Sequence, residues 1–260
     1  MTRAASLVAW LRLESRAAFM YRAKLMIGLF GWVVPLAFMA LWNLAADGSG
    51  IMSANQTSAY YLVILLTTNL FLGGEIIFGF ASRVYTGELS GLMLMPFPSL
   101  LAILPAPLMQ ALIRCAPLTV ALGLLTWALD ADFQISVFTA LIAVLLGFFG
   151  WIASVLFCYL YALTALWIGK SEGILGLFFG FWWVLSGLVA PSVFMPGWLG
   201  WVMRLSPLWL AVGGMGELLS GVVTPSWWMP VSLGVWIAGL AALLRWAWPR
   251  AMRRFEAIGI

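Results

Sequence analysis

Glu75 is the only acidic residue within an otherwise uncharged apolar segment, residues 59–80. An ionisable group within a membrane segment is costly, so it usually serves a function or is paired with an opposite charge. Two interpretations stay open for Glu75: it pairs with Arg83 or Arg114, or it lines a transport path or takes part in gating. Asn69 in the same segment is a further path candidate, although a helix–helix hydrogen bond is the simpler expectation.

The other reactive residue types argue against enzyme chemistry. The sequence contains no His, and its two cysteines, Cys115 and Cys158, lie in apolar runs without a CxxC spacing. It has no Gly-x-Ser-x-Gly motif and no Gly-Lys-[Ser/Thr] phosphate-binding loop. We therefore expect no catalytic site, no metal or cofactor bound by this chain, and no ATP hydrolysis by the chain itself.

The composition is that of a membrane protein with several spans. Of the 260 residues, 64% are hydrophobic and 8% are charged, whereas soluble domains average about 25% charged residues. Too few polar side chains are available to cover a soluble globule. The net charge of +4 does not indicate nucleic-acid binding, because the basic residues lie beside apolar segments.

The apolar segments predict an all-α fold in a single domain, residues 1–260, with six membrane-spanning helices, each of which needs about 20 apolar residues. The predicted spans are residues 25–45, 59–80, 115–129, 135–168, 173–193 and 227–248. Residues 100–114, which contain two prolines, are predicted to form a separate interfacial or re-entrant segment. Residues 81–99 are predicted to form a cytoplasmic loop, and residues 249–260 a cytoplasmic tail.

Two further segments are predicted to lie at the membrane surfaces. Residues 1–24 alternate basic and apolar side chains, which favours an amphipathic helix on the cytoplasmic surface; a simple basic leader before the first span is the alternative. Residues 194–226 are apolar but broken by Pro and Gly, which favours a re-entrant helical hairpin in the outer leaflet. This hairpin contains Arg204 and Glu217. The alternative is one additional span at residues 205–223.

The distribution of basic residues predicts the orientation. With both ends in the cytoplasm, 12 of the 13 basic residues lie on the cytoplasmic side, and Arg204 is the exception. Asp47, Asp130, Asp132 and Glu217 are predicted to lie outside. Tryptophans near the predicted span ends, including Trp182, Trp228 and Trp246, are expected to anchor the chain at the membrane interfaces.

Two short motifs resemble a known family. Residues 87–96 read Gly-Glu-Leu-Ser-Gly-Leu-Met-Leu-Met-Pro, and residues 253–259 read Arg-Arg-Phe-Glu-Ala-Ile-Gly. Both resemble bacterial ATP-binding-cassette (ABC) exporter permeases of type 2, a family of similar length that ends in Arg-Arg-[Tyr/Phe]-Glu-Ala-[Val/Ile]-Gly. The chain departs from the family at Glu88 and Met95, where a basic residue is common.

The resemblance implies a permease in the bacterial inner membrane that acts as a dimer with an identical or paralogous permease. Each permease would dock on a separate cytosolic ATPase chain, which binds ATP–Mg²⁺. It further implies an ATPase-docking surface in the loop after the second span, comprising Arg83, Gly87, Glu88, Leu89, Leu92, Met93 and Pro96. A lipidic, amphipathic or glycan substrate is expected. The alternatives are a membrane scaffold or channel subunit, or a membrane-embedded enzyme.

Overall fold

The computed structural model describes residues 9, 12, 30–70, 73–94, 102–168 and 172–257, and every regular element in this part is helical. Four of its helices are long and apolar enough to cross a membrane. They are Ala54–Val84, Pro105–Ala128, Val137–Trp167 and Trp228–Arg254; two shorter apolar helices are Val33–Ala46 and Gly176–Leu185. Almost all of the predicted N-terminal interface helix, together with Pro96, Lys170 and residues 258–260, lies outside the described residues.

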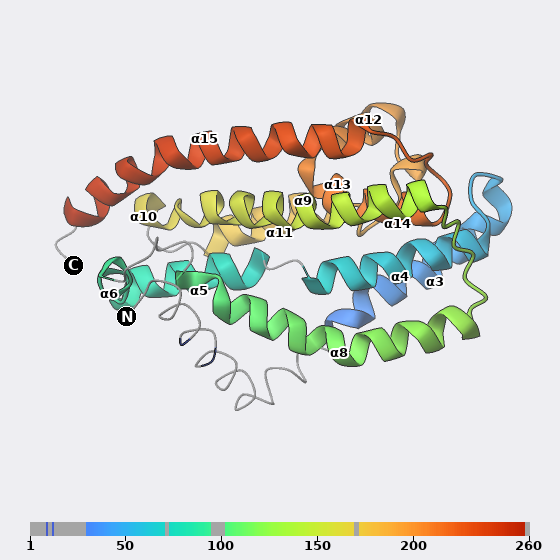
Figure 1. The fold of residues 1–260 in the computed structure, drawn as a ribbon, viewed down its shortest axis with the longest axis horizontal. Helices are drawn as coiled ribbons and strands as arrows, with labels where there is room; N and C mark the ends of the chain where they lie inside the picture. The colour runs from blue at the N-terminus through green and yellow to red at the C-terminus, as the bar shows by residue number, and fades with distance from the viewer. Residues whose placement is uncertain are drawn as a thin grey trace.

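The helices form an elongated bundle (Figure 1). Helix α9 (Val137–Ala162) packs along α15 (Trp228–Ala257) and also contacts α5 (Gly73–Thr86). Helix α4 (Ala54–Leu70) packs along α3 (Val33–Ser49), which follows the 3-10 turn η1 (Phe30–Trp32), and along α8 (Pro105–Ala128). The core between these helices is aromatic and aliphatic. Its largest fully buried side chains include Tyr60, Tyr61, Phe80, Tyr159 and Trp209.

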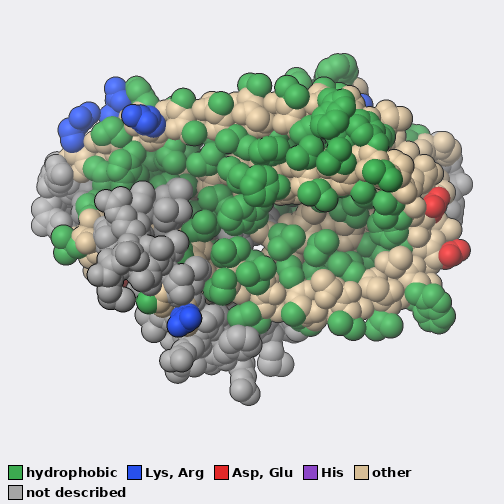
Figure 2. All heavy atoms as spheres, viewed as in Figure 1, with side chains coloured by type: hydrophobic (Ala, Val, Ile, Leu, Met, Phe, Trp, Pro, Cys, Tyr) green, Lys and Arg blue, Asp and Glu red, His purple; other side chains and the backbone are tan. Residues whose placement is uncertain are grey.

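The two ends of the bundle carry different elements and different charges. The short helices α6 (Leu89–Met93) and α10 (Ala165–Ile168) lie at the same end as the last turns of α15 (Figure 1). The short helices α12 (Gly197–Leu205), α13 (Pro207–Ala211) and α14 (Gly213–Leu219) lie at the other end. In the space-filling view, basic side chains gather at the first end and acidic side chains are visible at the second (Figure 2). This separation of charge is the one that the sequence predicts for the two membrane surfaces.

Helices α3 and α4 extend further into the polar sequence between them than the first two predicted spans do. The second predicted span begins at residue 59, after a stretch that is too polar for the membrane core, but α4 already begins at Ala54. Ser53 and Gln56 form a reciprocal cap: the Ser53 amide donates to Gln56 Oε1 at 3.0 Å, and the Gln56 amide donates to Ser53 Oγ at 3.1 Å. At the preceding turn, α3 extends to Ser49 instead of ending at Ala45.

The predicted division of the third segment at Arg114 is wrong. Helix α8 runs without a break from Pro105 to Ala128, so residues 105–114 belong to this long helix and not to a separate re-entrant segment. Pro105 and Pro107 stand in the first turn, where a missing N–H removes no helical hydrogen bond. Pro117 removes only one bond from the interior, and α8 continues through it.

The fifth predicted span is shorter than expected. Helix α11 (Glu172–Leu185) ends eight residues before Val193, and Gly187 follows with a φ of +85°. The Tyr60 hydroxyl donates to the Gly187 carbonyl at 2.6 Å, and the Tyr61 hydroxyl donates to the Val189 carbonyl at 3.0 Å. A Cβ at position 187 would lie 2.5 Å from the Tyr60 oxygen. Both the left-handed backbone and this contact therefore require glycine.

The predicted cytoplasmic loop and tail are more helical than expected. Helix α5 continues to Thr86, beyond the predicted span end at Phe80. Helix α15 continues through Pro249 to Ala257, so the predicted tail is largely an extension of the last span. Gly87, which has a φ of +76°, separates α5 from α6.

The segment predicted as a re-entrant hairpin consists of short helices rather than one span. It comprises η2 (Ser192–Phe194), α12 (Gly197–Leu205), α13 (Pro207–Ala211) and α14 (Gly213–Leu219). The alternative of a single span at residues 205–223 is wrong, because Val212 interrupts the helix with φ −125° and ψ −77°. Helices α13 and α14 pack against α9, and α14 also packs against α4.

Candidate functional site

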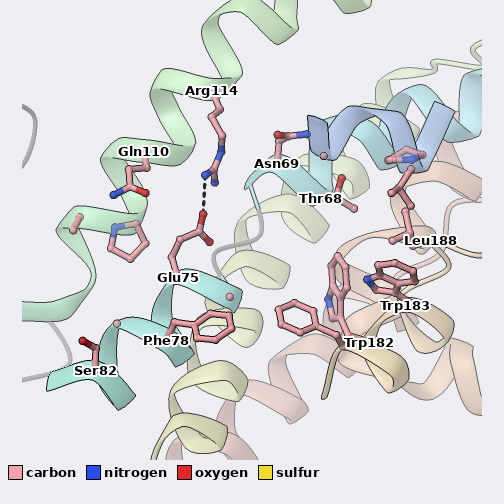
Figure 3. Close-up of a pocket in the computed structure, with 18 of the residues that line it drawn as sticks. Thr68, Asn69, Glu75, Phe78, Ser82, Gln110, Arg114, Trp182, Trp183 and Leu188 are labelled. Atoms are coloured by element: carbon pink, nitrogen blue, oxygen red, sulfur yellow. Dashed lines mark hydrogen bonds and ion pairs between the residues drawn. The ribbon is translucent and has the colours of Figure 1, made fainter. Parts of the chain in front are cut away.

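A cavity with polar and aromatic walls in the described residues has a volume of about 890 Å³. Its walls come from α4, α5, α8 and α11, together with residues around the start of α3 and Leu188 (Figure 3). The polar lining residues are Thr68, Asn69, Glu75, Ser82, Arg83, Glu88, Gln110 and Arg114. The cavity therefore gathers most of the intramembrane polar residues that the sequence singles out.

Glu75 and Arg114 form an ion pair in the cavity wall. Arg114 Nη1 on α8 lies 2.7 Å from Glu75 Oε1 on α5, and the two side chains are 13% and 24% exposed, respectively. Arg83 instead donates to the carbonyl of Gly79 in its own helix at 3.2 Å. Of the two basic partners considered for Glu75, Arg114 is the one that binds it. Since the pair also faces the cavity, pairing and a position on a path are compatible.

Gln110, which the sequence pattern does not single out, adds an acceptor to the α8 wall. Its Oε1 atom is buried and has no hydrogen-bond partner among the described residues. Gln110 lies one helical turn before Arg114, so both side chains project from the same face of α8 (Figure 3). A buried acceptor without a partner costs about 1–3 kcal/mol. A bound hydrogen-bond donor would remove that cost.

Among the described residues, Asn69 makes no hydrogen bond to another helix, in contrast to the expectation from the sequence. Its Nδ2 donates to the Leu65 carbonyl of its own helix at 2.7 Å, and Thr68 Oγ1 donates to the Ile64 carbonyl at 2.7 Å. Back-bonding of this kind satisfies polar side chains within one helix. Both residues nevertheless line the cavity.

The opposite wall of the cavity is aromatic. Phe179, Trp182 and Trp183 project from α11, and Phe78 projects from α5 (Figure 3). Trp182 is only 6% exposed, so it is a wall residue and not the interface anchor that its position near a predicted span end suggested. The cavity thus offers a charged and amide-bearing side and an aromatic side. Such a lining suits a molecule with both polar and apolar parts.

The predicted docking residues fall into three groups. Arg83 and Glu88 line the cavity, and Gly87 forms the turn before α6. Leu89 is fully buried within the chain, so it cannot contact a partner in this conformation, whereas Met93 is 41% exposed. The Leu92 side chain and Pro96 lie outside the described residues. The exposed apolar surface at this end includes Met93 and its neighbour Leu94, which is 87% exposed.

Glu217 belongs to a second polar cluster, at the other end of the bundle. The sequence predicts Glu217 on the outer side of the membrane. Its side chain is fully buried within the segment of short helices. The Ser192 amide, the Ser192 hydroxyl at 2.8 Å and the Trp209 indole at 3.3 Å all donate to its carboxyl group. Arg204 Nε donates to the Ser192 hydroxyl oxygen at 2.9 Å. Glu217 therefore joins η2, α12, α13 and α14.

Burial raises the pKa of Glu217 above its ordinary value of 4.5. The hydrogen bonds from Ser192 and Trp209 and the charge of Arg204 lower the pKa, but desolvation is the larger effect. Neither Ser192 nor Trp209 was identified from the sequence. The separation of 25 residues between Ser192 and Glu217 gives no local signal that the two would meet.

Two arrangements therefore emerge: a polar–aromatic cavity built around Glu75 and Arg114, and a buried carboxyl cluster that fixes the short helices. Among the described residues, no group of three or more His, Cys, Asp or Glu side chains could hold a metal ion. In comparisons with known proteins, no protein-family model, no curated protein and no solved structure matches the chain.

Proposed function

We propose that the chain is the membrane-embedded permease subunit of an ABC transporter in a bacterial inner membrane. It would span the membrane six times with both ends in the cytoplasm, and it would export a substrate with energy from a separate ATPase chain. The observation that supports this most is the segment of short helices, η2 to α14, before the last long helix. The family that the sequence resembles has short helices at that position.

The need for a partner follows from the sequence. The chain has no phosphate-binding loop, so ATP–Mg²⁺ must bind elsewhere and the force must enter through a surface. Helix α6 supplies such a surface at the basic end of the bundle, where Met93 and Leu94 are exposed. Gly87 and the short length of α6 set this helix off from α5. The ATPase would grip α6 and move α5 with it.

The cavity is the substrate site in this proposal. Motion of α5 would act directly on Glu75, which binds Arg114 on α8 in the cavity wall. The ion pair thus links α5, the helix next to the docking surface, to α8. The four charged lining residues, Glu75, Glu88, Arg83 and Arg114, sum to zero. A cavity that is neutral overall and partly aromatic favours an amphipathic substrate, lipidic or glycan-bearing, over a highly charged one.

The experiment is purification of the chain in a mild detergent from its own host, followed by reconstitution into liposomes. We expect a stoichiometric complex of two permease chains, identical or paralogous, with two ATPase chains and vanadate-sensitive ATP hydrolysis. The isolated chain should not hydrolyse ATP. A chain that purifies alone and conducts ions in a planar bilayer would instead be a channel subunit, and one that stays alone and inactive would be a scaffold.

A further inference from the structure

The end of α15 divides into two faces. Ala247 and Ala251 are buried and Trp248 and Met252 are half-buried, so these residues form the face packed on the bundle. The opposite half of the helix, at 3.6 residues per turn, carries six exposed side chains: Arg245, Trp246, Pro249, Arg250, Arg253 and Arg254. Four of these six are arginines within ten residues. Basic side chains are visible at the end of the molecule where α15 ends (Figures 1 and 2).

The same face of α15 is apolar further up the helix. Val231 is 63% exposed and Val235 is 69% exposed, and both lie in line with Trp246 and Arg253 along the helix surface. An exposed apolar stripe on a helix long enough to cross a membrane contacts acyl chains. The arginines therefore continue a lipid-facing surface.

Two tryptophans mark the depth of this stripe. Trp228 and Trp246 are 42% and 56% exposed, and the 18 positions between them correspond to about 27 Å of helix at 1.5 Å per residue. The hydrocarbon core of a bilayer is about 30 Å thick, and exposed tryptophans gather at its two boundaries. With Trp246 at the boundary, the side chains of the next two turns lie at the level of the lipid phosphates.

The Arg250 side chain, at the expected level of the lipid phosphates, is held in place by Trp246. Its guanidinium carbon lies 4.0 Å from the centroid of the Trp246 ring, and its Nη1 donates to the Trp246 carbonyl at 2.7 Å. The Arg250 guanidinium carries further N–H donors, which can bind a phosphate. Among the described residues, none of the four arginines forms an ion pair, since the one described pair joins Glu75 and Arg114.

We propose that Trp246, Arg250, Arg253 and Arg254 form a binding site for the headgroup of an anionic phospholipid. The phosphate would lie between Arg250 and the Arg253–Arg254 pair, and the acyl chains would follow the stripe through Val235. Charge complementarity and continuity with the lipid-facing stripe favour a membrane lipid over a free phosphate or an acidic protein surface. The proposal does not depend on an ATPase partner.

The test is native mass spectrometry of the full chain in detergent micelles that contain equal amounts of phosphatidylglycerol and phosphatidylcholine. We expect bound phosphatidylglycerol to be enriched. A basic residue near an anionic surface contributes about fivefold in affinity, so Arg250→Gln/Arg253→Gln/Arg254→Gln should reduce the enrichment roughly tenfold or more. The matched variant Arg250→Lys/Arg253→Lys/Arg254→Lys keeps the charge and should keep most of the enrichment.

Two further measurements distinguish a bound lipid from a free phosphate or an acidic protein surface. Enrichment should fall as NaCl is raised for the wild-type chain, a measurement that stays valid if the glutamine variant fails to fold. Glycerol phosphate at the lipid concentration should not displace the lipid. The proposal is overturned by equal enrichment in the wild-type chain and the glutamine variant, by salt-independent binding, or by displacement with glycerol phosphate. It is also overturned if the glutamine variant keeps its bound lipid but loses a protein partner.

Discussion

Arg114 Nη1 on α8 lies 2.7 Å from Glu75 Oε1 on α5, across a separation of 39 positions in the chain. This contact closes one side of the cavity with opposite charges from two helices that have few other contacts. Each charge offsets part of the desolvation cost of the other, and either charge buried without its partner would be strongly destabilising. The pair is therefore both a structural link and the charged part of the cavity wall.

Substitution of one residue of the Glu75–Arg114 pair should lower the stability of the chain. We expect Glu75→Gln to lower the stability of the purified chain by about 1–3 kcal/mol, because Arg114 loses its counter-charge. The double variant Glu75→Gln/Arg114→Gln should recover part of the loss. Thermal unfolding in detergent measures both. The control is Glu88→Gln, an exposed carboxylate in the same cavity, and an additive loss in the double variant would show that the pair contributes no coupling energy.

Helices α9 and α13 are in such close contact at Gly150 that a larger side chain at this position should destabilise the fold. A Cβ at Gly150 would lie 2.7 Å from the Ala211 Cα. Gly150→Ala should therefore destabilise the chain by about 1–3 kcal/mol. Gly239→Ala on α15 has no neighbour within 4 Å and should be neutral or slightly stabilising, as for a helical glycine. Equal melting temperatures for the two variants would contradict the described contact.

The buried carboxyl of Glu217 predicts a pH dependence with a defined sign. Its pKa is raised in the folded state, so the folded chain binds this proton more tightly than the unfolded chain. The contribution is fully present below pH 4.5, the ordinary pKa, and is lost as pH rises through the raised pKa. The melting temperature of the wild-type chain should therefore fall relative to that of Glu217→Gln over this range. A difference that does not change with pH would rule out the raised pKa.

The proposed docking surface at α6 predicts that a charge at Met93 disrupts assembly. Met93→Glu would place an unpaired carboxylate in a docked apolar contact, at a cost of several kcal/mol. We expect insertion into the membrane to be unchanged and copurification of the ATPase to be lost. Ser90→Glu adds the same charge to another exposed position of α6 and should preserve the complex. If Met93→Glu still copurifies with a full complement of ATPase, α6 is not the docking site.

The charge separation between the two ends of the bundle predicts the topology. In a chain with Cys115 and Cys158 replaced by alanine, Asp132→Cys should react with an impermeant thiol reagent in intact cells. Arg253→Cys should react only after the membrane is permeabilised. Both positions are exposed, so access to the reagent depends on the side of the membrane. Labelling of Arg253→Cys in intact cells would exclude the six-span arrangement.

The long apolar helices were predictable because their signal is local. About 20 consecutive apolar residues suffice to identify a span, and all four long helices overlap predicted spans. The helix ends were less predictable, because Ser53 and Gln56 satisfy the start of α4 with a cap in a stretch that looks too polar on average. The prolines led to a different error. Pro105, Pro107 and Pro117 suggested a helix break at Arg114, but α8 is continuous there.

The candidate site was only partly predictable, because it depends on contacts between distant residues. Glu75 stood out as a lone carboxyl in an apolar segment, and its pairing with a nearby arginine was one of the two interpretations left open. Glu217 was identified from the sequence only as an acidic residue of the outer hairpin. Its burial depends on Ser192 and Trp209, which reach it from separate short helices, and no spacing in the sequence encodes that meeting.

Helix α8 packs against fewer neighbouring helices than the other long helices do. Among the described elements it packs extensively only against α4, and a small share of its apolar span is buried. Its displacement therefore exposes little core surface and requires less free energy than displacement of α9, which contacts α5, α13, α14 and α15. Because α8 carries Gln110 and Arg114, an outward swing of this helix would open the cavity sideways toward the lipid. A hydrophobic molecule could then enter directly from the bilayer, without first dissolving in water.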